Sequence, residues 1–114
     1  MPTQEEILEI ERKFWTGGPE VYRDHADDEC TVVFSQMAQS MAREEIAGTA
    51  QCGRWRNVEI VPKIFRRVSA SSLLVVYECD AVRRDGRVHH VYASSLYVSR
   101  DDGWKLTFHQ QTEI

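Results

Sequence analysis

Histidine, tyrosine and carboxylate side chains are the residues of this sequence that could carry acid–base chemistry. His109 is a candidate general base, because an imidazole titrates near neutral pH. Tyr22 and Tyr77 could serve as hydroxyl donors or weak acids. Asp27 and Asp28 could form a carboxylate pair, although a solvated turn before a strand also explains them. These residue types alone assign no catalytic set.

Metal and nucleophile chemistry has little support in the residue spacing. His89 and His90 are adjacent in a predicted strand, so their side chains diverge, and no zinc-ligand spacing accompanies them. Ser94 and Ser95 lack the Gly-x-Ser-x-Gly pattern of a nucleophilic serine. We therefore predict no metal site and no cofactor.

Composition predicts one cytoplasmic domain spanning residues 1–114. The chain is 42% hydrophobic and 28% charged, a balance typical of a folded globular domain. No apolar run approaches the ~20 residues that cross a membrane, and the acidic N-terminal stretch does not resemble a signal peptide. The three cysteines are widely separated, which predicts reduced thiols rather than a disulfide framework: Cys30, Cys52 and Cys79.

Charge is unevenly distributed along the chain. The net charge of −4 argues against nucleic acid as a partner. Residues 1–45 carry 11 acidic and 4 basic side chains, whereas residues 46–114 carry 7 acidic and 10 basic ones. This division indicates either a solvated acidic helical face beside a mildly basic sheet, or a basic rim that favours an anionic ligand or an acidic partner.

Hydrophobic periodicity predicts helices first and strands afterwards. The first helix has a Thr3–Glu6 capping box and an apolar side that includes Ile7 and Trp15. The expected helices are Gln4 to Trp15, Pro19 to Ala26 and Ser40 to Gln51. The expected strands are Cys30 to Phe34, Val58 to Val68, Leu73 to Arg83, Val88 to Arg100 and Gly103 to Thr112. Pro62 marks the second strand as an edge strand or a bulged one.

Turn residues between the last three strands allow a prediction of their register. A two-residue Asp85-Gly86 turn would pair Tyr77 with Ser94, and Cys79 with Tyr92. A three-residue turn, Asp101 to Gly103, would bring together the pairs Val98–Leu106, Leu96–Phe108 and Ser94–Gln110. One face of the sheet would then change from purely apolar to polar along its length.

The polar end of that face, beside the helices, is the predicted binding pocket. Aromatic and sulfur-containing residues from the helices and connections would complete its wall, unless they serve only as core. The predicted pocket residues are Trp15, Tyr22, Phe34, Met37, Trp55, Tyr77, Tyr92, Ser94 and Gln110. The opposite face would mediate a homodimer through Ser95, Tyr97, Thr107, His109 and Gln111, which makes His109 an interface or surface residue.

Several stretches resemble the nuclear transport factor 2-like superfamily over essentially the whole chain. They are the Phe-Trp-Thr-Gly-Gly run at 14–18, Tyr22, the Ala-Asp-Asp run at 26–28, and the ending Asp-Gly-Trp-Lys-Leu-Thr-Phe-His-Gln-Gln-Thr. They look most like the SnoaL-like small bacterial members, of the domain of unknown function 4440 type. The resemblance implies an α+β fold, with three N-terminal helices packed on a strongly curved, mainly antiparallel, cone-shaped sheet, the cystatin-like roll.

This superfamily hosts several functions, so the resemblance alone names none of them. Its ketosteroid isomerase branch uses a carboxylate base and a helix-one tyrosine, whose positions correspond to Phe34 and Glu11 here. We expect a small-molecule-binding protein with a mostly apolar pocket. The alternatives are an acid–base enzyme (isomerase, dehydratase or cyclase) acting on a small apolar or aromatic substrate, and a dimeric association module with an incidental pocket.

Overall fold

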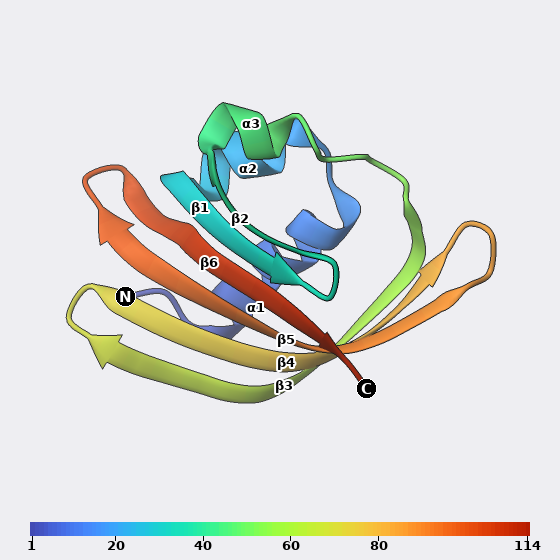
Figure 1. Cartoon of the computed structure of the whole chain (residues 1–114). Helices are drawn as coiled ribbons and strands as arrows, with labels where there is room; N and C mark the ends of the chain where they lie inside the picture. Colours follow the sequence, from blue (N-terminus) through green and yellow to red (C-terminus); the bar gives the residue numbers. More distant parts are fainter.

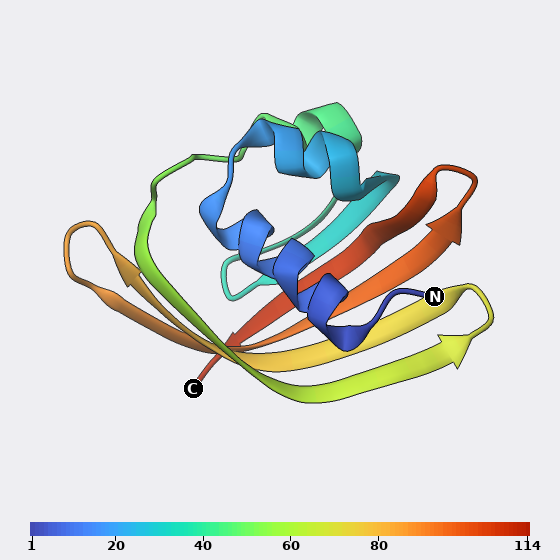
Figure 2. The ribbon, with the colours of Figure 1, turned by 180° about the vertical axis from the view of Figure 1, so that it is seen from behind.

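Six strands form one strongly curved sheet, and three short helices cover its concave face. The computed structural model describes all residues, 1–114. The helices are α1 (Gln4–Thr16), α2 (Pro19–His25) and α3 (Arg43–Ala47). The strands are β1 (Ala26–Phe34), β2 (Met37–Ala42), β3 (Trp55–Ser69), β4 (Ser72–Arg83), β5 (Val88–Arg100) and β6 (Gly103–Glu113). Figures 1 and 2 show all three helices on the same side of the sheet.

Strand order places the first strand of the chain beside the last. The order is β2-β1-β6-β5-β4-β3, with β1 and β6 parallel and the other neighbours antiparallel. Strands β3, β4 and β5 are longer than the usual 5–6 residues or so and twist accordingly, which curves the sheet around α1. No helix is long and apolar enough to span a membrane.

Helix α1 begins and ends close to its predicted bounds. The Thr3 hydroxyl accepts from the Glu6 backbone N–H, and the Glu6 carboxylate accepts from the Thr3 N–H, so the capping box is confirmed. Strand β3 lies at the sheet edge, and its register shifts between Pro62 and Ile64, as the proline predicts.

The segment after β1 differs from the prediction of a helix from Ser40 to Gln51. Met37–Ala42 instead forms β2, an edge strand that pairs with β1 through a tight turn at Ser35 and Gln36. Ser40 therefore lies in a strand and caps no helix. Helix α3 is restricted to Arg43–Ala47, where the Glu45 carboxylate accepts from the backbone N–H of Ala42. Backbone pairing outweighs the weak helical pattern of this polar stretch.

The predicted β4–β5 register was wrong by one residue. Cys79 pairs with Val91 and Tyr77 with Ala93, because the turn holds three residues, with Gly86 at φ +90°. The Arg83 N–H donates to the Arg87 carbonyl at 2.9 Å, which closes this longer turn. A one-residue slip turns every β5 side chain to the other face of the sheet.

The β5–β6 register combines a tighter turn with a bulge. Arg100 pairs with Gly103 and Val98 with Lys105, so the predicted Val98–Leu106 pair was wrong. A register shift between Leu96 and Tyr97 then restores the predicted Leu96–Phe108 and Ser94–Gln110 pairs. These last two pairs lie on the face away from the helices, which corrects the predicted assignment of the two faces.

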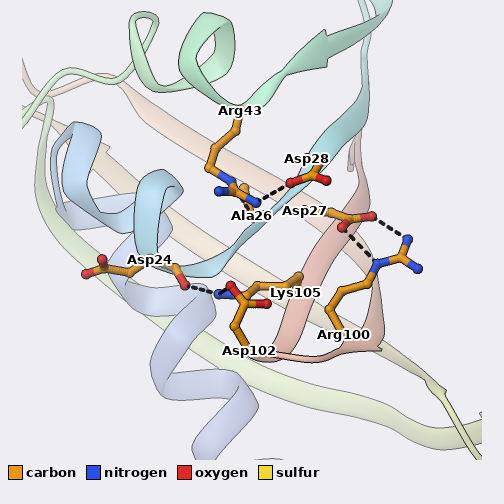
Figure 3. A network of polar contacts seen from close by, with 8 residues as sticks. All are labelled: Asp24, Ala26, Asp27, Asp28, Arg43, Arg100, Asp102 and Lys105. Carbon is orange, nitrogen blue, oxygen red and sulfur yellow. Dashed lines mark hydrogen bonds and ion pairs between the residues drawn. The ribbon is translucent and has the colours of Figure 1, made fainter.

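Charged side chains link β1 to α3 and to the end of β5, and link α2 to the start of β6 (Figure 3). Arg100 makes a bidentate ion pair with Asp27, at 2.9 and 2.8 Å. Arg43 donates to the Ala26 carbonyl and to Asp28, and Lys105 donates to the Asp24 carbonyl at the end of α2. The Asp27-Asp28 pair thus makes structural contacts with two arginines, one to each carboxylate.

Candidate functional site

A cavity of about 440 Å³ lies between the helices and the concave face of the sheet. Its apolar wall is largely aromatic and comes mainly from α1, α2, β1 and the start of β3, with one apolar residue each from β2, β5 and β6. Five of the nine predicted pocket residues line it: Trp15, Tyr22, Phe34, Met37 and Trp55. Its polar wall comes mainly from β5 and β6, with two arginines near β3 and β4: His89, His109, Gln111, Glu113, Arg54 and Arg83.

The other four predicted pocket residues lie elsewhere. Tyr77 is fully buried behind the cavity wall. Tyr92 is 41% exposed on the outer face of the sheet. Gln110 donates to the Ser94 hydroxyl at 2.8 Å on that same outer face. The β5 residues were misplaced because the β4–β5 turn has one residue more than predicted.

Four of the five residues predicted to form the dimer face lie instead on the concave face of the sheet. Ser95 and Tyr97 are fully buried beneath α1, and His109 and Gln111 line the cavity, so these four residues belong to the concave face. Thr107 lies at the bulge in β6 and has no partner in β5.

A buried carboxylate, Glu11, lies at the centre of the helix–sheet contact. Helix α1 presents Ile7, Glu11 and Trp15 to the sheet, because residues four apart share one side of a helix. Glu11 is 1% exposed and accepts three hydroxyl hydrogen bonds: from Tyr77 at 2.7 Å, from Ser95 at 2.7 Å, and from Tyr97. The sequence signal for this site was a glutamate in the middle of an otherwise apolar helix face.

Hydrogen bonds extend this network outward in two directions. The Trp15 indole N–H donates to the Tyr77 hydroxyl at 2.9 Å, which connects Glu11 to the aromatic cavity wall. The Ser95 hydroxyl lies 2.7 Å from Nδ1 of His109. Ser95 donates its only hydroxyl proton to Glu11. Nδ1 of His109 therefore carries the proton in the contact between His109 and Ser95.

The tautomer of His109 follows from these contacts. With its proton on Nδ1, a neutral imidazole has a lone pair on Nε2, which accepts from the Gln111 amide N–H at 3.0 Å. The Gln111 amide oxygen in turn accepts from Nε2 of His89 at 3.2 Å. A continuous chain of donors and acceptors therefore runs from His89 at the cavity wall to Glu11 in the core.

Burial shifts the titration of the groups in and around the cavity. It lowers the pKa of His109, while the nearby Glu11 carboxylate acts in the opposite direction. Burial and the Glu11 charge raise the pKa values of Tyr77 and Tyr97 well above the ordinary value for tyrosine. Burial raises the pKa of Tyr22 to about 12. All three tyrosines are therefore hydroxyl donors at neutral pH.

Aromatic rings organise the cavity mouth. Trp55 packs against Trp15 and His89, with ring centroids 5.3 and 5.4 Å apart. The Arg83 guanidinium lies 5.2 Å from the centre of the Trp55 ring. Tyr22 also lines the cavity, and its hydroxyl has no hydrogen-bond partner within the protein.

Chemically, the site offers an imidazole in a mostly apolar cavity, supported from behind by a carboxylate. The Nδ1–H to Ser95 to Glu11 chain fixes the imidazole orientation and can stabilise an imidazolium. No three histidine, cysteine or carboxylate side chains lie close enough together to hold a metal ion.

Comparison with solved structures identifies similar folds at low sequence identity. An NTF2-like protein of unknown function in nutrient uptake from Rhodospirillum rubrum has a TM-score of 0.80 and 12% identity, with 99% of each chain covered. A candidate ketosteroid isomerase from Parabacteroides distasonis has a TM-score of 0.78 and 12% identity, covering 99% of this chain and 89% of that one. An NTF2-like protein from Prochlorococcus sp. NATL2A has a TM-score of 0.74 and 16% identity, covering 99% of this chain and 94% of that one. No protein-family model matches the sequence, and no curated protein matches it significantly.

Proposed function

We propose that this chain, which has the nuclear transport factor 2-like fold, binds a small apolar or aromatic molecule in the cavity beneath its helices. The fold resemblance inferred from the sequence is confirmed by those comparisons, for the fold alone. The observation that carries the proposal is the cavity, whose wall combines aromatic rings with a few convergent polar groups.

The size and chemistry of the cavity support a ligand of one or two rings. A volume of about 440 Å³ lies within the roughly 300–1,000 Å³ of ordinary ligand pockets. Trp15 and Trp55 offer ring surfaces for stacking, while His109 and Gln111 on β6 offer polar contacts. This arrangement favours a flat molecule with one polar edge.

Tryptophan fluorescence would test this proposal, because Trp15 and Trp55 both line the cavity. Titration with a panel of bicyclic aromatic probes should change the emission saturably. A Trp55→Ala variant should weaken binding about tenfold, because a stacking contact is lost. Tyr92→Ala, on the outer face, is the matched control and should bind as the natural chain does. Lack of saturable binding by every probe would refute the proposal.

A second candidate function, acid–base catalysis, is favoured by the His109–Ser95–Glu11 chain. Nε2 of His109 would remove a proton from a bound substrate, and the hydroxyl of Tyr22 would donate to the oxygen on which charge develops. Deuterium exchange from heavy water into bound cyclic ketones, followed by NMR, would test this activity. His109→Gln should abolish the exchange, and exchange at an unchanged rate would contradict it.

We further propose that the outer face of the sheet pairs with a second copy of this chain. Half-buried or exposed apolar side chains gather on that face: Ile64, Leu74, Val76, Leu96 and Phe108. Leu96→Glu should convert a dimer into a monomer in sedimentation experiments, because a charge would be buried at the contact. Val88→Glu, at an exposed strand end, is the control, and a Leu96→Glu protein that stays dimeric would rule out this face.

A further inference from the structure

The buried carboxylate of Glu11 has hydroxyl partners but no permanent cation beside it. The only basic group within 4.0 Å is the imidazole of His109, whose Nδ1 lies 3.7 Å from Glu11. The His109 side chain is itself only 13% exposed. A proton added to His109 would therefore form an ion pair with a carboxylate that is already in position.

Groups from every neighbouring element define the surroundings of His109. Glu11 from α1, Ser95 and Tyr97 from β5, and Tyr77 from β4 lie on its buried side. Aromatic and imidazole rings lie on the cavity side: Phe34 from β1, Tyr22 from α2 and His89 from β5. Gln111 and Glu113 from β6 also lie there, and Arg54 and Arg83 are at the mouth. Neither of these two arginines makes an ion pair within the protein, and Glu113 is exposed near the chain end.

The lone pair on Nε2 of His109 determines which ligand groups can bind at the polar wall of the cavity. An anionic oxygen cannot approach that lone pair, because both are acceptors. Once protonated, Nε2 becomes a donor to the anion, and the Gln111 amide can turn so that its N–H groups point to the ligand or to His89.

We propose that the cavity selects an aromatic carboxylate, and that binding of this anion places a proton from the solvent on Nε2 of His109. This inference rests on the proposed binding function and specifies its ligand class. The ligand carboxylate accepts from the new Nε2–H, and the imidazolium charge is balanced by Glu11 through Ser95. Arg54 and Arg83 at the mouth attract the anion, and the aromatic wall holds its ring.

The proton balance makes the affinity dependent on pH. Burial lowers the pKa of His109 below 6.5 in the free protein, whereas a bound anion raises it. Between these two pKa values, each complex takes up one proton as it forms. The dissociation constant should therefore rise about tenfold for each pH unit through that window.

Calorimetry with two matched probes tests the inference on the natural chain. 1-Naphthoate and the neutral 1-naphthamide are titrated near pH 7 in phosphate and in Tris, which differ in ionisation enthalpy. We expect about one proton taken up per naphthoate and none per naphthamide, because only the anion needs a donor at Nε2.

Each alternative outcome has a distinct meaning. Naphthamide binding without naphthoate binding, or naphthoate binding without proton uptake, would overturn the anion inference and leave the binding function standing. Failure of both probes would overturn the anion inference, and lack of saturable binding by the whole panel of bicyclic probes would overturn the binding function as well.

Substitution of His109 provides a second test. His109→Gln should abolish proton uptake and weaken naphthoate binding at least about tenfold, with naphthamide nearly unaffected. His90→Gln is the matched control, because His90 pairs with Glu78 on the outer face at 2.6 Å and does not line the cavity. Equal proton uptake by the His109→Gln protein would assign the proton to another group and refute the inference.

Discussion

Removal of single hydroxyls around Glu11 gives the sharpest test of the buried network. Tyr97→Phe deletes one oxygen from a fully buried ring and leaves Oε2 of Glu11 without that donor. A hydrogen bond to a charged group contributes about 1.5–3 kcal/mol to stability. We expect the free energy of unfolding to fall by that amount.

Tyr77→Phe should be more damaging, because the Tyr77 hydroxyl has two buried partners. It donates to Glu11 at 2.7 Å and accepts from the Trp15 indole at 2.9 Å. Its loss adds an unsatisfied indole N–H, at a further cost of about 1 kcal/mol or more. The expected order of destabilisation is Tyr77→Phe, then Tyr97→Phe, then Tyr92→Phe, which removes an exposed hydroxyl and should change stability by less than about 0.5 kcal/mol.

Urea unfolding, followed by circular dichroism, measures these differences. The total stability of a small domain is roughly 5–15 kcal/mol, so each single variant should still fold and give a complete transition. If Tyr77→Phe and Tyr97→Phe unfold within about 0.5 kcal/mol of Tyr92→Phe, the hydroxyl–carboxylate contacts do not stabilise the fold and the reasoning is wrong.

Three further predictions concern charge and backbone conformation. The ion pair with Arg100 lowers the pKa of Asp27 below 3.8, so the ion pair stabilises the fold above that pH, and this stabilisation is lost as the pH falls through the folded pKa. Asp27→Asn should therefore lower the free energy of unfolding by about 1 kcal/mol at neutral pH, since Arg100 is half exposed, and should change nothing in strong acid. Urea titrations at several pH values would check this. Burial lowers the pKa of His109, so the free protein should lose stability as the pH drops below 6.5, and His109→Gln should flatten that part of the curve; an unchanged curve would contradict it. Gly86 has φ +90°, and no other atom lies near the position that a Cβ would take. Gly86→Ala should therefore lower the free energy of unfolding by about 1 kcal/mol, and with it the melting temperature, through backbone strain alone. An unchanged melting temperature would argue against the three-residue turn.

The sequence predicted those parts of the fold that depend on local patterns. The capping box of Thr3 and Glu6, the edge position implied by Pro62, and the long alternating strands all produce a local signal, and the structure has each of them. β2 had no such signal, because an exposed edge strand of polar residues is stabilised mainly by pairing with β1.

The candidate site was harder to predict because it depends on register. Asp85-Gly86 fits a two-residue turn as well as the last two residues of a three-residue turn. This difference of one residue in turn length decides whether Ser94 or Ser95 faces the helices. The bulge near Tyr97 has no marker in the sequence, so His109 was assigned to the wrong face. The positions of five predicted residues do not depend on that register, and these residues line the cavity: Trp15, Tyr22, Phe34, Met37 and Trp55.

The parallel pairing of β1 with β6 has a consequence for how the chain folds. The last strand lies between β1 and β5, so the pairing of Val32 with His109 joins parts of the chain that are far apart in sequence. The β1–β2 hairpin can form early, but one of its edges stays unpaired until β6 arrives. Contacts this distant in sequence slow folding and leave that edge open to pairing with other chains. The polar wall that β6 brings to the cavity therefore lies beside the strand pairing that joins the most distant parts of the chain.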